Sequence, residues 1–356
     1  MKKLISALLL ICIAFSMLSC DTQSARQNDK KRNREISDFY FNTYSQISTY
    51  NDDDDFKIEQ YVKIADEVLS YYHKLFDIYI EYSGINNIRT INKNAGKNPV
   101  VVDEELIVFL EYCKEMYTLT GGKTNIMFGS VLKIWHDCRD NANKSFGYLD
   151  PSLLPSDETL ANAAKHTSID SLVIDRESST VYISDPEASI DVGAIAKGYA
   201  VDVLYNRIKD AGADSTVLNI GGNIRTIGLK ADGGHWVTGI TNPDNSSDEP
   251  LICRIQIGET SIVTSGDYER YFISGEESYH HIIDPDTLMP ARYFSSVSIL
   301  ADNSAISDAL STALFCMSYE DGLALIKEIG GIEVIWVLPD GSLKSTENID
   351  FYGENK

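Results

Sequence analysis

Residues 191–200, with the sequence DVGAIAKGYA, carry one carboxylate (Asp191), one lysine (Lys197) and several small residues where we expect a strand to lead into a helix. The N-terminus of a helix presents free backbone N–H groups and a partial positive charge, which suit a phosphate group. Small side chains leave the backbone open to a ligand, and Lys197 can reach an anion from this position. The role of Asp191 is left open, because an aspartate in front of a helix can belong to a ligand site or can simply cap the helix.

A second group of oxygen-bearing residues lies on a helix that we expect over residues 305–317. Asp308 and Thr312 are four residues apart, so both side chains face the same side of a helix, and Ser311 lies at the edge of that face. A carboxylate and a hydroxyl suit Mg²⁺, which prefers hard oxygen ligands and keeps several waters. The same pair also fits a capped helix whose threonine bonds back to the backbone.

Two histidines, His280 and His281, precede the sequence IIDP at residues 282–285, which we expect to be a strand that ends at a proline turn. A histidine beside a metal-bound diphosphate can take the proton from an attacking hydroxyl. The alternative is a sheet histidine hydrogen-bonded to a neighbour such as Asp284. A further pair of glycines, in the sequence LNIGGN at residues 218–223, permits close backbone approach, although a hairpin turn alone also explains it.

In their order along the chain (191–200, 218–223, 280–285 and 308–312) and with this spacing, the four motifs resemble those of the ApbE-like flavin transferases, also called FAD:protein FMN transferases. Members of that family use Mg²⁺ to split FAD and attach FMN through its phosphate to a threonine of another protein. The resemblance runs from about residue 38 to 340 and is strongest from 190 to 315. It implies His281 as the general base. It also implies the metal ligands, which are the Ala194 backbone carbonyl, Asp308, Thr312 and, where many members have a second acid, Ser311.

The resemblance places contacts to the flavin and the adenine mainly in the first half of the chain. The family's Met-Gly-Thr strand reads FNT at residues 41–43, and its Gly-Ala-x-Asp segment reads GKTN at residues 122–125. The family's Thr-Gly-x-Pro loop reads TLMP at residues 287–290, which bears on substrate access. Tyr82 can stack on the isoalloxazine ring or pack at a helix end. The residues implied in FAD binding are Phe41, Tyr82, Lys123, Thr124, Asn125, Asp191, Lys197, Thr264 and Ser265.

The start of the chain has the pattern of an export signal that ends in a lipid-modified cysteine. Two lysines precede an apolar run at residues 4–18, which is shorter than the roughly 20 residues that a membrane-spanning helix needs. The sequence MLSC at its end resembles a bacterial lipobox, so Cys20 is a candidate for lipidation. The alternative is ordinary signal cleavage with Cys20 unmodified. We expect residues 1–19 to be the signal, 20–36 a flexible tether and 37–345 a single folded domain.

The chain is strongly acidic, with 53 aspartates and glutamates against 31 lysines and arginines and a net charge of −22. Removal of the signal, which contains two lysines and no acid, changes the net charge to −24. Affinity for nucleic acid depends mainly on Lys and Arg that neutralise phosphates, so this balance argues against a nucleic-acid partner. An anionic ligand must then be bound through a metal ion, backbone N–H groups or a few well-placed basic side chains.

Four cysteines remain once the signal and Cys20 are set aside, namely Cys113, Cys138, Cys253 and Cys316. Their wide spacing lacks the density of a disulfide scaffold, and the first and last lie among apolar helical residues. We therefore expect buried thiols. Because the chain contains no Cys-x-x-Cys or histidine-rich spacing, we expect no zinc site.

The periodicity of apolar residues and the turn residues predict an α+β chain, with helices early and a mostly antiparallel sheet later. The expected helices cover residues 58–82, 104–117, 126–135, 156–165, 193–211, 305–317 and 318–329. The expected strands cover residues 38–50, 171–174, 180–184, 215–220, 223–229, 235–241, 251–257, 261–265, 268–274, 282–285, 297–301 and 333–338. The resemblance adds that the helices flank the sheet in an ApbE-like, T-fold-related architecture.

The resemblance thus implies Mg²⁺-dependent transfer of FMN from FAD to a threonine of an acceptor flavoprotein, such as a subunit of a membrane redox complex, with release of AMP. With water as the nucleophile, the same site gives an FAD pyrophosphatase. A third alternative is a non-catalytic FAD-binding lipoprotein, which is favoured if the altered segments 123–125 and 287–290 disable turnover. The lipobox implies a location in the bacterial cell envelope, on a membrane and facing the extracytoplasmic side.

Overall fold

The structure is a computed structural model that describes residues 32–35, 39–50 and 55–353. The expected signal and Cys20 lie outside these residues, as do the acids at 52–54, so the expectations for them remain predictions. In the described part of the chain, no helix combines the length and the apolar character needed to cross a bilayer. The four cysteines after Cys20 are buried and unpaired, which confirms the expectation of buried thiols.

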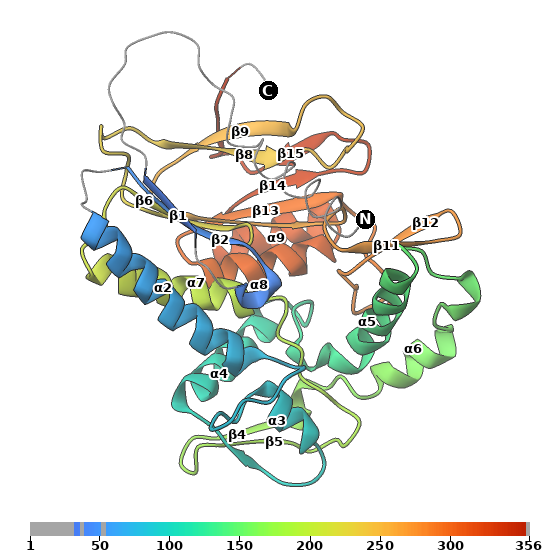
Figure 1. Ribbon diagram of the computed structural model, residues 1–356. Helices are drawn as coiled ribbons and strands as arrows, with labels where there is room; N and C mark the ends of the chain where they lie inside the picture. Colours follow the sequence, from blue (N-terminus) through green and yellow to red (C-terminus); the bar gives the residue numbers. More distant parts are fainter. Residues whose placement is uncertain (1–31, 36–38, 51–54, 354–356) are drawn as a thin grey trace.

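An eight-stranded antiparallel sheet lies at the centre of the described residues (Figure 1). Buried and half-buried positions alternate along β6 (Thr216–Ile220), because successive side chains of a strand point to opposite faces. In order across the sheet, the strands are β1 (Arg32–Glu35), β2 (Ser45–Thr49), β6 (Thr216–Ile220), β7 (Asn223–Ile227), β10 (Ser261–Gly266), β13 (Ser296–Ala301), β14 (Glu333–Val337) and β15 (Leu343–Ser345).

Two different layers cover this sheet. Helices α7 (Ala196–Asp210), α8 (Ser304–Phe315) and α9 (Tyr319–Ile329) lie on one face, and the small sheet of β16 (Asp350–Phe351), β9 (Leu251–Ile257) and β8 (Trp236–Thr241) lies on the other (Figure 1). Two neighbouring residues of β14 show the division. Trp336 packs with the helices, whereas Ile335 packs with the small sheet.

A helical layer lies beyond α7, on the side away from the central sheet (Figure 1). Helices α2 (Asp55–Phe76) and α4 (Glu104–Leu119) pack against α7 in one hydrophobic cluster. At its centre the rings of Phe76 and Phe109 stack with centroids 3.9 Å apart, and Tyr199 meets Phe109 edge-on. A small sheet of β3 (Val100–Val101), β5 (Thr180–Ile183) and β4 (Leu172–Asp175), together with α3 (Ile88–Lys93), closes this end.

The remaining elements form a separate lobe around α5 (Gly129–Lys144) and α6 (Asp157–Ala164) (Figure 1). The hairpin of β11 (Tyr271–Ser274) and β12 (Glu277–His280) packs on α5 through a stack of Trp135, Tyr279 and Phe272. Short 3-10 turns join the elements, at Tyr40–Asn42, Ile126–Phe128, Pro151–Leu153 and Ile169–Ser171.

The α+β class with a mostly antiparallel sheet and flanking helices is confirmed. Some expected boundaries are wrong. The helix expected to 82 ends at Phe76, because the Asp77 carboxylate accepts hydrogen bonds from the N–H groups of Tyr79 and Ile80 and turns the chain. The helix expected from 193 begins at Ala196, because the Asp191 carboxylate binds the Gly193 N–H and forms a turn instead of capping the helix.

Two expected strands also need correction. Residues 38–50 are not one strand, because Phe41 and Asn42 adopt positive φ values of 53° and 55° before β2 begins at Ser45. The strand expected at 282–285 is wrong, because these residues form only an isolated bridge between Ile283 and Pro290, and β12 ends before them at His280. Both ends of the expected domain also shift, because β1 forms within the expected tether and β16 extends the fold beyond residue 345.

Candidate active site

Helices α7 and α8 cross so closely at Gly198 that only glycine fits there. A Cβ atom on this residue would lie 2.2 Å from the Ser304 carbonyl oxygen and 2.6 Å from the Cβ of Asp308. This closeness allows the Gly198 N–H to donate a hydrogen bond of 2.8 Å to Oδ2 of Asp308. The crossing therefore joins two of the sequence motifs, because the N-terminal turn of α7 faces the carboxylate carried by α8.

The Asp308 carboxylate is held in a buried, electropositive environment, with 6% of the residue exposed. Burial raises its pKa, while the charge of Lys197 and the Gly198 N–H favour the ionised form. Lys197 is itself held across the crossing, because its Nζ lies 3.3 Å from the Gly221 carbonyl and 3.1 Å from Oδ1 of Asn223. A buried carboxylate with an unfavourable desolvation energy is well suited to binding a cation.

The two hydroxyls near Asp308 differ in how they are used. The Ser311 hydroxyl donates to the Asp308 carbonyl at 2.9 Å and lies 2.8 Å from the Ser265 hydroxyl of β10. Thr312 is half-buried, and among the described residues its hydroxyl has no hydrogen-bond partner. The back-bonded hydroxyl is thus that of Ser311, and Asp308 and Thr312 keep oxygen atoms for a ligand. The roles of all three in metal binding stay predictions.

Thr264 does not reach this site. Its hydroxyl lies 2.8 Å from that of Ser298, its partner across β10 and β13. Adjacent residues of a strand point to opposite faces, and Ser265 points to α8. Thr264 therefore lies on the face that carries the small sheet, and only Ser265 remains a candidate for binding phosphate.

The two histidines at the end of β12 have different surroundings. His280 uses both ring nitrogens, because Nδ1 accepts from the Ile282 N–H at 3.3 Å and Nε2 lies 2.7 Å from the Ala291 carbonyl oxygen. The buried Nδ1 of His281 has no partner. Burial is the main cause that lowers the pKa of His281 well below its usual value, and the positive charge of Arg270 adds to it. A neutral ring with a free nitrogen can accept a proton.

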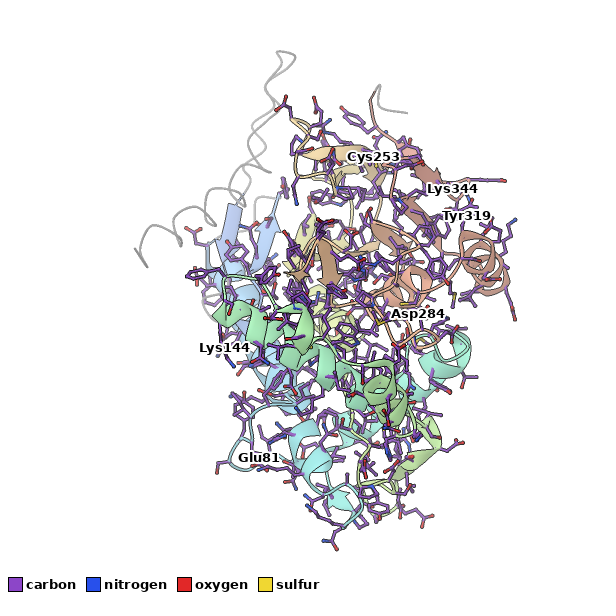
Figure 2. The ribbon with its side chains drawn as sticks, turned by 90° about the vertical axis from the view of Figure 1, so that its right-hand side faces the viewer. Glu81, Lys144, Cys253, Asp284, Tyr319 and Lys344 are labelled. Atoms are coloured by element: carbon purple, nitrogen blue, oxygen red, sulfur yellow. The ribbon has the colours of Figure 1, made fainter. Side chains whose placement is uncertain are left out.

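The carboxylate that we considered as a partner for His281 is used elsewhere. Asp284 forms an ion pair of 2.8 Å with Lys123 and accepts from the Asp286 N–H at 3.1 Å. In Figure 2 Asp284 lies between the helices of the lower half and the sheet-containing upper half. The hydrogen bond from a histidine to Asp284, which was the alternative to the role as a base, is therefore absent for His281 in the described structure.

The segment 123–125, expected to contact the nucleotide, instead joins parts of the protein. The Lys123 ammonium group also lies 2.8 Å from Asp286, and the Thr124 hydroxyl donates to the Ala309 carbonyl of α8 at 2.7 Å. The Asn125 amide accepts from the Met127 N–H and donates to the Thr167 carbonyl, both at 2.9 Å. These polar groups are occupied, so the geometry does not favour them as FAD contacts.

In the 287–290 loop, Leu288 has a left-handed backbone conformation at the position where the family that the sequence resembles has a glycine. Leu288 has a φ of 62°, a conformation that costs a side-chain-bearing residue about 1–2 kcal/mol. Its carbonyl accepts from Nε1 of Trp135 at 3.0 Å, and its N–H donates to the Asp284 carbonyl at 2.8 Å. The loop therefore has a backbone path that suits glycine, although glycine itself is missing.

A groove of about 1000 Å³ runs between α3, α5, α6 and residues 186–191. This volume is at the upper end of the range for small-molecule sites, which suits a dinucleotide. Tyr79 lines the groove with 60% of its surface exposed, whereas the Tyr82 hydroxyl donates to Asp77 at 2.8 Å outside the groove lining. Tyr79 therefore lies in the lining of the groove, where an aromatic ring can stack on it, and the role of Tyr82 in flavin binding stays a prediction.

His136 connects the groove with the histidine site. It lines the groove together with Asp191, whose Oδ2 lies 3.9 Å from its Nδ1, and it also lines a second, small cavity in front of His281. Phe41 lies outside the groove, where its N–H donates to Nδ1 of His73 at 3.2 Å. Sequence reasoning did not identify Tyr79 or His136, since neither falls in a motif.

The turn between β6 and β7 brings the glycine pair of the LNIGGN motif to the α7–α8 crossing. A Cβ on Gly221, which has a φ of 57°, would lie 2.2 Å from the Thr43 hydroxyl. The glycine pair therefore allows residues 41–43 to approach the backbone of the turn, whose carbonyl binds Lys197.

The donors near Asp308 differ from those of a histidine- or cysteine-rich metal centre. Among the described residues, no three His, Cys, Asp or Glu side chains are grouped to hold a metal. One carboxylate, one free hydroxyl and backbone oxygens nevertheless fit the preferences of Mg²⁺, which binds few protein groups and keeps waters. Ala194 lies in the turn before α7, where its carbonyl is not part of the helix.

Residues 41–336 match the model of the ApbE family. The chain is 33% identical over 271 residues to the FAD:protein FMN transferase of Treponema pallidum, covering 74% of this chain and 73% of that protein. It is 25% identical over 335 residues to the protein of the same name from Haemophilus influenzae, and the match covers 92% of this chain and 91% of that protein. The fold resembles the ApbE protein of Thermotoga maritima, with a TM-score of 0.75, 28% identity and coverage of 89% of this chain and 97% of that one. The fold also resembles the flavin transferase ApbE of Vibrio cholerae, with a TM-score of 0.71, 26% identity and coverage of 89% of this chain and 97% of that one.

Proposed function

The chain belongs to the ApbE family, and we propose that it is an FAD:protein FMN transferase that requires Mg²⁺. The observation that carries this proposal is the α7–α8 crossing, where the buried Asp308 carboxylate meets the start of α7 beside Lys197. A helix start and a lysine suit the phosphates of FAD, and the carboxylate suits the cation that accompanies them.

The residues that would hold the metal are Asp308, Thr312 and the backbone carbonyl of Ala194. When bound, Mg²⁺ would supply neutralisation of negative charge on the diphosphate, which is the main requirement of phosphoryl transfer. Lys197 and the N–H groups at the start of α7 add positive potential at the same place. The groove beside α5 holds the rest of the dinucleotide, with Tyr79 available to stack on an aromatic ring.

His281 is the proposed general base. Its low pKa keeps the ring neutral near pH 7, and Nδ1 is free to accept the proton of a threonine hydroxyl. The threonine oxygen then forms a bond to the FMN-side phosphorus, and the bond from that phosphorus to the bridging oxygen of the diphosphate breaks. AMP leaves with the electron pair, and the proton passes from His281 to solvent or to the leaving phosphate.

The test uses purified protein with FAD, Mg²⁺ and a threonine-bearing acceptor flavoprotein. AMP release together with an FMN-sized mass increase on an acceptor threonine is the expected result. AMP with free FMN only would identify a pyrophosphatase. FAD binding without AMP would identify a non-catalytic flavin-binding protein.

We further propose that Cys20 carries lipid and anchors the protein in the bacterial cell envelope, facing the extracytoplasmic side. The support is the lipobox-like sequence MLSC after a short apolar segment. Cys20→Ser should move the protein from the membrane fraction to the supernatant without loss of folding. A variant that stays in the membrane fraction would contradict lipid attachment at this residue.

A further inference from the structure

Two arginines from distant parts of the chain line the small cavity in front of His281. Arg139 is on α5, and Arg270 directly precedes β11. His136, three residues before Arg139 on α5, lies on the same side of that helix and lines the cavity as well. Because His136 also lines the large groove, this basic group lies between the groove and His281.

Neither guanidinium group has an acidic partner. Among the described residues, no side-chain hydrogen bond or ion pair within 4.0 Å involves Arg139 or Arg270. Arg176 shows what the chain does elsewhere, because its guanidinium binds both Glu111 and Glu104. In a chain with 53 acidic and 31 basic residues, two unpaired guanidinium groups beside one cavity indicate a site for an external anion.

The charges around this cavity also oppose one another. Desolvation is the main cause that lowers the pKa of Arg270, the negative charge of Glu269 acts against this shift, and the positive charge of Arg139 adds to it. The same two groups and Lys197 act on His281, where after burial they favour the neutral ring. An anion bound between the two guanidinium groups would offset the repulsion between them.

We propose that Arg139 and Arg270 bind the phosphate oxygens of the FAD diphosphate and hold it between the groove and His281. This inference rests on the proposed function, because it takes FAD as the ligand. A guanidinium group presents N–H donors in a planar fork that matches phosphate oxygens. The cavity is now only about 10 Å³, so the two flexible side chains must turn toward the anion when it binds.

The test compares FAD with riboflavin, which has the same ring system and no phosphate. In wild-type protein FAD should bind much more tightly than riboflavin. Arg139→Gln and Arg270→Gln should each raise the Kd for FAD by about 10- to 100-fold, since a hydrogen bond to a charged group has roughly that effect. The Kd for riboflavin should not change. Inorganic pyrophosphate should compete with FAD in the wild type and lose this effect in the double variant.

The matched control is Arg254→Gln. Arg254 is an exposed arginine of β9, in the small sheet on the far side of the central sheet. Its replacement removes the same charge and should leave both Kd values unchanged. A Kd for FAD that rises equally in this control would attribute the effect to net charge and overturn the proposal.

Thermal stability provides a readout that does not depend on turnover. Removing two mutually repelling and unpaired cations should leave the Tm of the ligand-free double variant equal to or above that of the wild type. The rise in Tm on adding FAD should shrink, because stabilisation of the folded state by a ligand grows with the logarithm of the ligand concentration divided by its Kd. A double variant with lower ligand-free stability would indicate a structural role, and an unchanged FAD-induced shift would equally contradict the anion site.

The two proposals fail in different ways. If the wild type binds FAD through these arginines and releases no AMP, the proposed function fails and the anion site stands. If the wild type transfers FMN and the double variant binds FAD equally well, the transferase function stands and the anion site is wrong.

Discussion

The α7–α8 crossing and the segment 123–125 both carry residues that the sequence pointed to, yet the structure uses them differently. At the crossing, the Thr312 hydroxyl has no partner among the described residues, and neither has Nδ1 of His281, which directly follows β12. In the other segment, Lys123 and Asn125 have all their main polar groups occupied by the protein itself. A polar residue in a motif can therefore serve a ligand or the fold, and its unpaired atoms distinguish the two.

The difference has a physical cause. A buried polar group without a partner costs free energy, so a protein keeps such groups mainly where a ligand will bind them. Asp308 retains a raised pKa even with Gly198 and Lys197 beside it. The Lys123–Asp284 pair, in contrast, satisfies both charges and ties the segment to the 284–290 loop.

The largest effect on turnover is expected from the carboxylate of the crossing. Asp308→Ala should reduce AMP release by about 10⁴-fold or more, which corresponds to roughly 5–6 kcal/mol of lost charge stabilisation. The ligand-free protein should be as stable as wild type at pH 7, because a group whose folded pKa is raised favours folding only at low pH. AMP assays and thermal melts measure both. A variant with substantial turnover would remove Asp308 from the site.

The next effect concerns the base. His281→Ala should keep FAD affinity and slow transfer by something on the order of 10²–10⁴-fold, with the loss easing as pH rises. In the wild type the rate should be flat above neutral pH and should fall only in acid, because burial lowers the pKa of His281 well below its usual value. His280→Gln serves as the comparison, since its ring nitrogens are engaged within the fold. Wild-type turnover in His281→Ala would make this histidine structural.

A smaller effect tests the geometry of the crossing. In Gly198→Ala the new Cβ would overlap the Ser304 carbonyl, so α7 and α8 must move apart. We expect a loss of about 1–3 kcal/mol in the free energy of unfolding and roughly 10- to 100-fold in turnover. Gly258→Ala is the control, because its Cβ would have no neighbour closer than 4.0 Å. Equal behaviour of the two variants in urea unfolding and AMP assays would contradict the close crossing.

The smallest effect on turnover is expected from substitutions in the segment 123–125. Lys123→Met leaves the buried Asp284 carboxylate without its cation and should cost about 3–5 kcal/mol in the free energy of unfolding. FAD affinity and the rate of the folded fraction should stay near wild type. Lys63→Met, which removes an exposed pair with Glu67 on α2, should change stability by less than about 1 kcal/mol. A selective loss of FAD binding in Lys123→Met would show that this segment contacts the nucleotide after all.

Local patterns predicted much of the fold. Ser318 accepts from the Asp321 N–H and starts α9 where the sequence placed it, and the turn after Asp175 joins β4 and β5 as expected. The end of α2 was missed because its cause is tertiary as well as local. The Asp77 carboxylate forms a turn with Tyr79, and its carbonyl accepts from the Arg89 N–H of α3.

The site was predictable where one element carries the pattern. The spacing of Asp308 and Thr312 needs only helical periodicity, and both lie on α8. The need for glycine at position 198 depends on α8, which comes about 100 residues later in the chain. The proximity of Arg139 to Arg270 depends on how α5 packs against the β11–β12 hairpin. Occupied groups such as those of Asn125 were not predictable either, because their partner Thr167 is distant in sequence.

The most direct test of the central claim is calorimetric titration of Mg²⁺ into FAD-saturated protein. If the α7–α8 crossing holds the metal and the segment 123–125 serves the fold, wild type and Asn125→Ala should bind Mg²⁺ with similar affinity. Asp308→Ala should show no saturable binding in the same range. Undiminished Mg²⁺ binding by Asp308→Ala, or its loss in Asn125→Ala, would contradict this assignment of the two regions.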